Sequence, residues 1–187
     1  NRQEERYSGI FDFSRKVNLK DCNKRVFESL SVGGAFDEFE LNRSQYFALD
    51  DRGRTVIETA IRYGNAFQEA ENSSQVSLFG ESAEIDLPEP IIPNSEEWPI
   101  MDKLSREKEV VGIYISGHPL DDFKLEMEHL CTTGGLKLLQ DQQAIKNKKM
   151  KFGGMLSEVQ HRTTKKGKPF GMFNMEDYEH NERFFLF

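Results

Sequence analysis

Long apolar runs are absent from this sequence, and none approaches the roughly 20 residues that a transmembrane helix needs. Residues 1–6 do not form a signal peptide. Cysteine is scarce, because Cys22 and Cys131 are the only two and stand far apart, without CxxC or Cys/His ligand spacing. We therefore expect a cytoplasmic protein with two reduced thiols and no disulfide, zinc site or membrane segment.

An initiator methionine is also missing, and the sequence stops on an apolar run, residues 184–187, that a natural terminus seldom leaves exposed. The 187 residues are 37% hydrophobic and 30% charged, which suffices for one medium or two small cores. We therefore expect a fragment of a longer protein.

The net charge of −7 hides a division along the chain. Residues 69–110 carry eleven acidic side chains against three basic ones, whereas residues 137–168 carry nine basic side chains against two acidic ones. A solvated lysine-rich loop is the commoner explanation of any one lysine cluster. A local basic surface of this density is also typical of a nucleic-acid footprint, even in an acidic protein.

The first third of the chain predicts two helices joined by a glycine-bearing hairpin, after a partly packed lead-in. Asn23 has the position of an N-cap, and the helical apolar period that follows it stops at Gly33-Gly34. Asn42 opens the next helix, and apolar residues again recur at helical spacing over 56–67. Glycines in such a hairpin let backbone N–H groups approach phosphate oxygens, which gives DNA contact independent of sequence. The alternative is an ordinary αα-hairpin.

A short apolar peptide stands inside the acidic segment: Gln75 is followed three and four positions later by Leu78 and Phe79. One interpretation is a docking peptide, with Leu78 and Phe79 as anchors in a partner's pocket and Gln75 at its rim. The other is that the two apolar side chains fold back and fill a gap in a neighbouring domain. The spacing leaves both open.

Trp98-Pro99 begin a new folded segment, with Pro99 at a first helical position. Ile100, Leu104 and Val111 share one face of this predicted helix.

The motif at residues 116–120 stops that helix and starts another, whose apolar side chains are Leu120, Phe123, Met127 and Leu130.

His118 lies beside Ser116, Asp121 and Asp122, which are the residue types of a hydrolase site. A His and an Asp at a helix start are more often capping residues, and the other histidines form no second half of a site. We expect capping here, and no catalytic residue in the chain.

From about Lys149 the apolar period changes to two, which predicts strands. The first runs to Val159 with a bend at the glycine pair 153–154, the second covers 169–176 after a basic turn, and the third covers 183–187. This pattern resembles the first half of an OB-fold, which stacks bases on aromatic rings and holds phosphates with Lys and Arg. An OB-fold needs five strands, so we expect a truncated sheet and an α+β chain.

Four blocks in this order resemble a known family: residues 23–37, the peptide 75–79, residues 107–120 with the Ser-Gly-His-Pro-Leu motif, and the Thr-Lys-Lys-Gly-Lys-Pro-Phe block at 164–170. Together they resemble the C-terminal part of the bacterial replicative DNA polymerases of the C family, the DNA polymerase III alpha subunits. The resemblance covers nearly the whole chain.

The resemblance implies four parts. Residues 1–68 are part of a tandem helix-hairpin-helix domain that binds duplex DNA, and 69–97 are an acidic linker with a peptide that binds the sliding clamp. Residues 98–148 form a helical connecting segment, and 149–187 are the first strands of an OB-fold that contacts single-stranded template.

The resemblance also implies site residues. The duplex contacts are Lys24, Arg25, Gly33, Gly34 and Arg43. The clamp contacts are Gln75, Leu78 and Phe79. The single-strand contacts are Phe152, Arg162, Lys165, Lys166, Lys168 and Phe170.

The family's catalytic aspartates lie in a palm domain upstream, so the resemblance implies a nucleotidyltransferase parent that uses magnesium and a fragment without catalysis, metal or cofactor. The implied partners are DNA, the sliding clamp and other replicase subunits. The alternative is a freestanding, non-enzymatic adaptor that binds single-stranded nucleic acid and carries a peptide tether.

Overall fold

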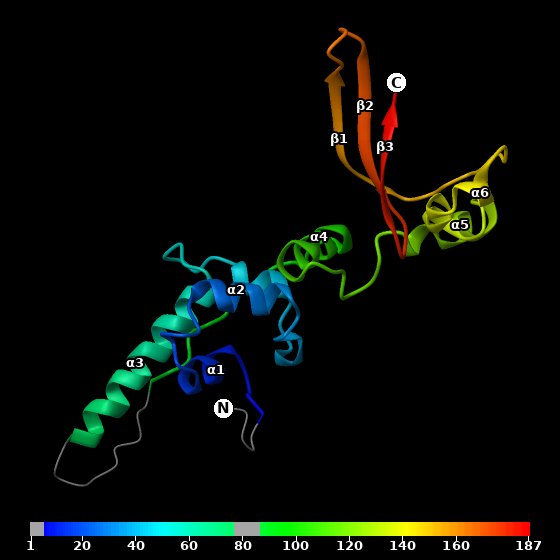
Figure 1. Ribbon diagram of the computed structural model, residues 1–187. Helices are drawn as coiled ribbons and strands as arrows, with labels where there is room; N and C mark the ends of the chain where they lie inside the picture. Colours follow the sequence, from blue (N-terminus) through cyan, green and yellow to red (C-terminus); the bar gives the residue numbers. More distant parts are fainter. Residues whose placement is uncertain (1–5, 77–86) are drawn as a thin grey trace. The chain divides into compact units, whose positions relative to one another are not determined.

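The structure, a computed structural model, describes residues 6–76 and 87–187. It forms two compact units, Asn1–Ile115 (unit 1) and Ser116–Phe187 (unit 2), which are described separately (Figure 1). Helices make up unit 1, and a three-stranded antiparallel sheet with short helices makes up unit 2, so the predicted α+β class is confirmed. Among the residues described, no helix is long and apolar enough to cross a membrane.

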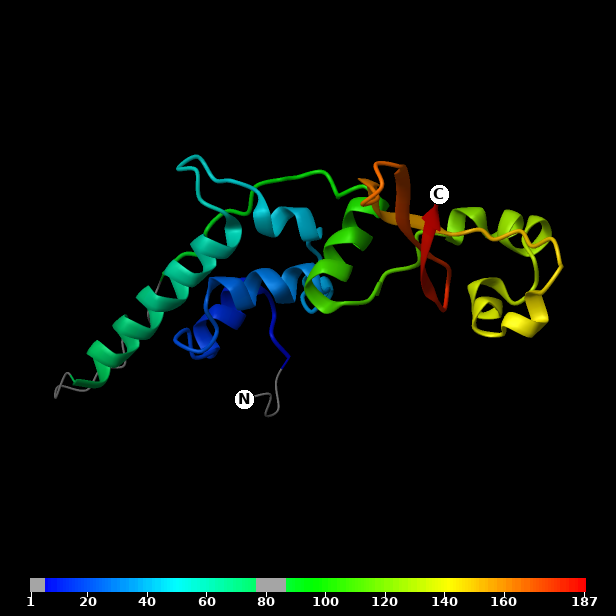
Figure 2. The same ribbon diagram turned by 45° about the horizontal axis from the view of Figure 1, so that its top comes forward.

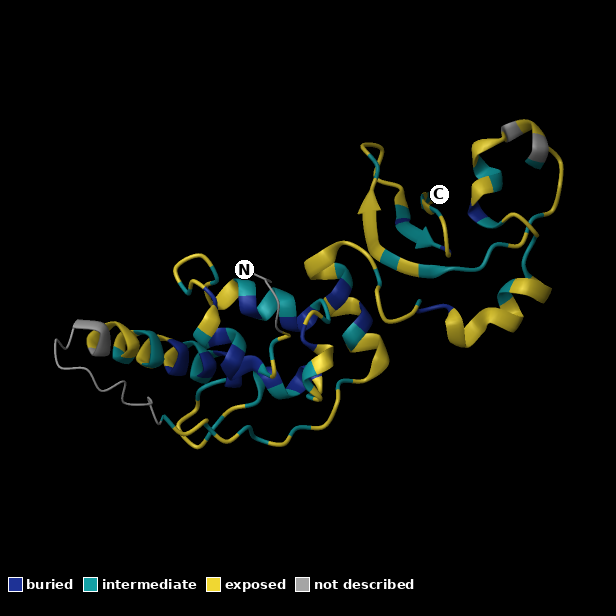
Figure 3. Cartoon of the chain, turned by 90° about the horizontal axis from the view of Figure 1, so that it is seen from below, coloured by how far each residue is buried: buried dark blue, intermediate teal, exposed yellow. Residues whose placement is uncertain are grey.

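Unit 1 is built on an aromatic-rich core. Its elements are α1 (Ile10–Lys16), α2 (Lys24–Val32), the 3-10 helices η1 (Asp37–Phe39) and η2 (Arg43–Phe47), α3 (Val56–Val76) and α4 (Ile100–Val111). The core lies where α1, α2 and the first half of α3 meet, and Figure 3 shows its buried residues in dark blue. Its aromatic members are Phe11, Phe27, Phe36, Tyr46 and Tyr63.

Helix α1 replaces the partly packed lead-in predicted from the sequence. Ile10 and Phe11 belong to the core, although no side chain caps the start of the helix at Gly9. Gly64 of α3 lies so close to α1 that a Cβ there would collide with the backbone of Ser14. The position of α1 therefore depends on its contacts with α3. The local sequence around α1 does not predict these contacts.

The end of α1 is also held by α3. The Gln68 side-chain amide donates to the carbonyl oxygens of Ser14, Arg15 and Val17 at 3.3, 3.0 and 2.9 Å. These are carbonyls that a helix end leaves without intrahelical partners. Beyond this contact α3 continues to Val76, and its C-terminal half extends away from α1 and α2 (Figures 1 and 2).

The predicted caps are confirmed in part. The Asn23 side chain accepts the N–H of Val26 at 3.3 Å, and α2 ends at Gly33 as expected. Asn42 does form a capping box with Gln45, but the helix that it opens is the short 3-10 helix η2 rather than an α-helix.

The apolar face predicted for α4 is wrong in detail. Leu104 is buried, but Ile100 and Val111 are exposed, and the buried neighbour of Leu104 on this helix is Glu107. The side chain of Glu107 is buried because it has polar partners in unit 1, described below.

Unit 2 carries the sheet on a set of short helices. Its elements are η3 (Asp121–Phe123), α5 (Lys124–Leu130), η4 (Gly135–Gln140), α6 (Gln142–Ile145), β1 (Met155–Thr163), β2 (Pro169–Glu176) and β3 (Asn181–Leu186). The apolar face predicted for 120–130 is buried only at Leu120, while Phe123 and Leu130 are exposed.

The strands follow in the order β1-β2-β3, each antiparallel to the next. β1 begins at Met155 rather than at Lys149, because Lys151 pairs with Thr132 instead of with the sheet. The register slips between Ser157 and Gln160, which is a β-bulge. Both outer strands have only one strand neighbour within the described residues, so the sheet is open.

Candidate nucleic-acid interfaces

The hairpin between α1 and α2 is a tight turn with basic side chains around it. Asn18 organises the turn: its carbonyl oxygen accepts the N–H of Cys22 at 2.9 Å, and its side chain accepts the N–H of Lys20 at 3.1 Å. Lys20, Lys24 and Arg25 are exposed beside it. This hairpin is not among the sequence predictions, because the segment before it is predicted as a partly packed lead-in rather than as the helix α1.

Lys24 already has partners in the protein. Its ammonium lies 2.8 Å from the Glu58 carboxylate and 3.7 Å from that of Glu28. The hydrogen bond with Glu58 raises the pKa of Lys24 and lowers that of Glu58. The pair is exposed to water, so a phosphate can compete for Lys24 at little cost.

The Gly33-Gly34 turn does not offer its N–H groups to a ligand in this conformation. The N–H of Gly33 donates to Ser29 O at 2.9 Å, that of Gly34 to Ser31 O at 3.3 Å, and that of Ala35 to Leu30 O at 2.9 Å. These bonds satisfy the last carbonyls of α2. The glycines thus close a helix, which is the ordinary role that the sequence left open for them.

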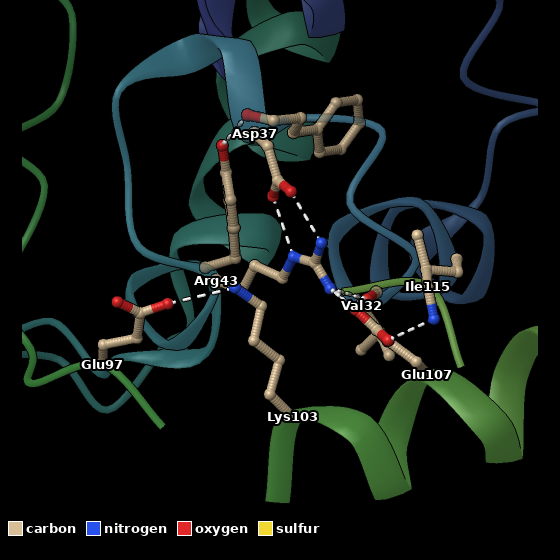
Figure 4. A network of polar contacts seen from close by, with 9 residues as sticks. Val32, Asp37, Arg43, Glu97, Lys103, Glu107 and Ile115 are labelled. Atoms are coloured by element: carbon tan, nitrogen blue, oxygen red, sulfur yellow. Dashed lines mark hydrogen bonds and ion pairs between the residues drawn. The ribbon is translucent and has the colours of Figure 1, made fainter. Parts of the chain in front are cut away.

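Arg43 is the centre of a polar network in unit 1 (Figure 4). Its side chain is 4% exposed, and its guanidinium donates to both carboxylate oxygens of Asp37 at 2.8 and 2.6 Å. It also donates to Val32 O at 2.9 Å and to the Glu107 carboxylate at 2.5 Å. The hydrogen bonds with Asp37 raise the pKa of Arg43 against the opposing effect of burial. Arg43 therefore lacks the accessible side chain that a duplex contact requires.

Gly34 makes room for this network. Its φ of +80° lies in the left-handed region that favours glycine, and a Cβ would collide with the Arg43 guanidinium. Arg43 and Gly34 are therefore tied together as parts of one packing arrangement and not as two phosphate ligands.

Glu107 extends the network to the end of unit 1. Its side chain is 0% exposed, and its second oxygen accepts the N–H of Ile115 at 2.7 Å (Figure 4). Glu107 is not among the predicted site residues, although it is the first residue of the third sequence block, 107–120. A glutamate next to a buried Leu104 was the available signal, but its partner Arg43 is 64 residues away in sequence.

The basic turn between β1 and β2 brings most of the predicted single-strand residues together. Lys165, Lys166 and Lys168 are exposed on a tight turn that Gly167 closes with a φ of +77°. Arg162 is the cross-strand partner of Phe170 at the same end of the sheet. These two residues help to line a shallow pocket of about 360 Å³.

Phe152 does not join them. It precedes the glycine pair 153–154, and Gly154 lies against Glu176, at the far end of β2 from the basic turn. The nine residues of β1 span roughly 30 Å at about 3.3 Å each. Phe152 and Phe170 thus cannot stack on adjacent bases.

The Ser-Gly-His-Pro-Leu motif acts as a cap and a packing point within unit 2. The His118 N–H donates to the Asp121 carboxylate at 2.7 Å, and His118 Nδ1 accepts the N–H of Leu120 at 3.2 Å. The ring of Tyr178 lies 4.6 Å from that of His118, and its hydroxyl donates to Leu120 O at 2.8 Å. Burial, followed by the Asp121 charge, raises the pKa of Tyr178. These contacts agree with the predicted capping role.

Two other features bear on the predicted sites. Gln75 and Val76 are the last residues of α3, whereas Leu78 and Phe79 lie outside the described residues, so the docking and core-filling interpretations of this peptide both stay open.

A pocket of about 770 Å³ lies between α5 and the turn 177–180, and none of the predicted site residues lines it.

Comparison with known proteins identifies relatives for nearly the whole chain. A family model described as a helix-hairpin-helix motif matches residues 1–46. The DNA polymerase III subunit alpha of Bacillus subtilis is 33% identical over 177 residues, which is 94% of this chain. The subunits of the same name from Saccharopolyspora erythraea and Campylobacter jejuni are each 32% identical, over 93% and 95% of this chain.

This chain spans only 14% of the length of each of these relatives. The resemblance inferred from the four sequence blocks is confirmed. The helix-hairpin-helix match covers α1, the turn at Asn18 and α2, and it extends through Gly33-Gly34 to η2.

Proposed function

Because the chain is related to a segment of the bacterial DNA polymerase III alpha subunits, we propose that it is a DNA-binding, non-catalytic region of a replicative DNA polymerase. The observation that carries the proposal is the similarity over 94% of the chain, joined to the helix-hairpin-helix match. Motifs of this kind hold the DNA backbone through phosphate contacts, which position the protein without reading sequence.

The duplex contact in this proposal is the α1–α2 hairpin. Lys20, Lys24 and Arg25 are exposed there, and α2 points its N-terminus at the same turn. Cations and a helix N-terminus both favour phosphate. Gly33, Gly34 and Arg43 lie at the other, C-terminal end of α2 and are not part of this surface.

The single-strand contact is the basic turn with the adjoining sheet, as the start of an OB-fold. Lys165, Lys166 and Lys168 neutralise phosphates, and Phe170 beside Arg162 stacks a base. Two observations favour this assignment over a solvated loop. Residues 137–168 carry an excess of basic side chains. The ring of Phe170 is the cross-strand neighbour of one of them, Arg162.

The parent protein in this proposal is a DNA-directed DNA polymerase that acts in the cytoplasm with other replicase subunits. Its palm domain, with the carboxylates that hold magnesium, lies outside this chain. We therefore expect no primer extension by the 187-residue chain with nucleotides and magnesium, and extension by the pure chain would overturn the assignment.

The experiment that tests the DNA-binding role uses two matched triple variants. Lys165, Lys166 and Lys168→Ala removes three positive charges from unit 2, and Lys20, Lys24 and Arg25→Ala removes three from unit 1. Fluorescence anisotropy with labelled single strands and duplexes is measured over a range of salt concentrations. The first variant is expected to reduce the single-strand salt slope by about two, at roughly 0.7 per phosphate contact.

The second variant is expected to weaken duplex binding and to leave single-strand binding unchanged. Each variant is the charge-matched control for the other. Equal losses on both ligands in both variants would indicate general electrostatics and would contradict the two assigned surfaces.

We also propose that Gln75, Leu78 and Phe79 dock onto the sliding clamp and tether the polymerase for processive replication. Replacing Leu78 and Phe79 with Ala is expected to remove on the order of 2–4 kcal/mol of clamp binding. The melting temperature should stay nearly unchanged. A large stability loss with clamp affinity intact would support the core-filling interpretation instead.

A further inference from the structure

The three-stranded sheet has two unlike faces. The register places Gln160, Arg162, Phe170, Met172, Asn174, Arg183 and Phe185 on one face, here called the polar-aromatic face. The other face carries Gly171, Phe173, Met175, Phe184 and Leu186 and is here called the apolar face. Both arginines of the strands lie on the polar-aromatic face.

Flat rings line the polar-aromatic face. Phe170 stacks on Phe187 with centroids 5.5 Å apart and ring planes 16° apart, and Phe187 stacks on Phe185 at 6.5 Å and 19°. Phe185 is 51% exposed. A row of nearly parallel, accessible rings between two arginines has the shape and charge that suit stacked bases on a phosphate backbone.

The register also places Glu176 on this face, and a second acidic residue, Glu158, lies beside Arg183. Glu158 lies in the bulge of β1, and its Oε2 accepts hydrogen bonds from Arg183 Nη2 at 2.9 Å and from Asn174 Nδ2 at 2.8 Å. Arg183 Nε donates to Asn174 Oδ1 at 2.8 Å, which closes a triangle across the three strands. The carboxylate thus occupies the position beside Arg183 that a phosphate oxygen would take.

The backbone of Glu158 supports a specific role for its side chain. Its φ of +50° lies in the left-handed region, where residues other than glycine pay a steric cost. The bulge turns the carboxylate onto the polar-aromatic face next to Arg183. Arg183 and Glu158 are 49% and 57% exposed, so their ion pair is weak enough for a ligand to displace.

We propose that the polar-aromatic face binds single-stranded nucleic acid through base stacking on Phe170 and Phe185, and that Glu158 competes with the backbone phosphates for Arg183. This inference rests on the proposed single-strand function of the sheet. It adds Phe185 and Arg183 to the binding surface. Glu158 lowers the affinity for single strands, because each bound strand must first displace the Glu158 carboxylate from Arg183.

The test compares two glutamates on opposite faces. Glu158→Gln and Glu182→Gln each remove one negative charge, and Glu182 pairs with Met175 on the apolar face. Anisotropy with a labelled oligothymidylate is expected to show about two- to five-fold tighter binding for Glu158→Gln, the range of an exposed ion pair. Glu182→Gln should change affinity by much less, and equal effects would overturn the role of Glu158.

A double-mutant cycle sharpens the test. If Glu158 acts through Arg183, the gain from Glu158→Gln disappears in an Arg183→Gln background. Persistence of the full gain there would overturn the competition.

A second comparison tests the face. Phe185→Leu on the polar-aromatic face is expected to weaken single-strand binding by about five-fold or more. Phe184→Leu on the apolar face should leave it unchanged, with melting temperatures recorded for both. The reverse pattern would overturn the choice of face.

Different results would contradict the single-strand function of the sheet and the specific role of its polar-aromatic face. If the variant of Lys165, Lys166 and Lys168 weakens binding but the glutamate and phenylalanine pairs do not differ, this inference alone is wrong. If the chain binds no single strand at all, both are wrong.

Discussion

Unit 1 and unit 2 use the same residue types in opposite ways. In unit 1 the rings of Phe27 and Tyr46 are completely buried, and charged side chains are turned inward. In unit 2, within the described residues, the buried apolar side chains are few, and the phenylalanines of the sheet range from partly buried to largely exposed. Figure 3 shows the sheet in the colours of intermediate and exposed residues, apart from one short buried stretch. Aromatic and charged side chains therefore stabilise the core of unit 1, whereas in unit 2 the same residue types lie mainly on the surface.

The arginines make the contrast concrete. Arg43 is 4% exposed and has two carboxylates and a backbone carbonyl as partners, whereas Arg183 is 49% exposed and has one weak ion pair. Removing a partner of the first should cost stability, and removing the partner of the second should change binding. The burial of an arginine thus separates a side chain that stabilises the fold from one that stays accessible to a ligand.

The largest expected effect breaks the buried network. Glu107→Ala should lower the free energy of unfolding of unit 1 by about 3 kcal/mol or more, because Arg43 stays buried with one carboxylate instead of two. Urea unfolding can be followed by the fluorescence of Trp98, the single tryptophan, which packs on Phe47 in unit 1. Glu109→Ala on the exposed side of α4 is the control. Equal losses in the two variants would contradict the importance of the network.

A smaller effect separates backbone strain from packing. Gly34→Ala and Gly53→Ala both place a side chain at positive φ, but only Gly34 faces the Arg43 guanidinium, while nothing lies near Gly53. We expect Gly53→Ala to cost about 1–2 kcal/mol and Gly34→Ala to cost about 1 kcal/mol more. Thermal melts of both variants check the difference, and identical losses would mean that Arg43 moves aside freely.

The third prediction concerns acid in unit 2. Burial alone would raise the pKa of Asp177, but hydrogen bonds from the N–H groups of Leu136, Glu179 and His180 outweigh it and lower the pKa. Because the folded pKa is below the unfolded value of about 3.9, this stabilisation is complete above that pH and is lost as the pH falls through the folded pKa.

Asp177→Asn should therefore cost unit 2 about 1–2 kcal/mol at neutral pH and remove part of its acid sensitivity. Amide NMR signals of β2 and β3 give the stability of unit 2 as a function of pH, and Trp98 fluorescence should be unaffected. An unchanged acid profile in the variant would assign the sensitivity to other groups.

The smallest effect is expected on the exposed face of the sheet. Phe185→Leu should change the free energy of unfolding by less than about 0.5 kcal/mol, because half of the ring already faces water. Thermal melts beside a Phe27→Ala variant, expected to lose about 3–5 kcal/mol in unit 1, give the scale. A large loss for Phe185→Leu would make that ring part of a core and would remove the contrast between the units.

Local signals carried the correct sequence predictions. The cap at Asn23, the end of α2 at Gly33 and the whole of β2 depend on hydrogen bonds and periodicity within a few residues. The predictions of α1 and of the start of β1 were wrong, because contacts with residues distant in sequence determine both. Helix α1 is held by Gln68 of α3, and Lys151 hydrogen-bonds to Thr132 instead of joining the sheet.

The candidate sites divide in the same way. The cluster of Lys165, Lys166 and Lys168 was predictable because a turn keeps sequence neighbours together. The burial of Arg43 was not, because its partner Glu107 comes from another helix. The polar-aromatic face was not predictable either, because the register of β3 against β2 decides which of Phe184 and Phe185 shares a face with Phe170.

The three hydrogen bonds from Gln68 to the end of α1 have a consequence for the order of folding. A helix of seven residues does not persist alone in water, so α1 forms only when α3 is already present to receive it. The contacts of Gln68 should therefore be absent from the folding transition state. Gln68→Ala is then expected to speed unfolding while leaving the folding rate nearly unchanged, because the contacts that it removes form after the transition state.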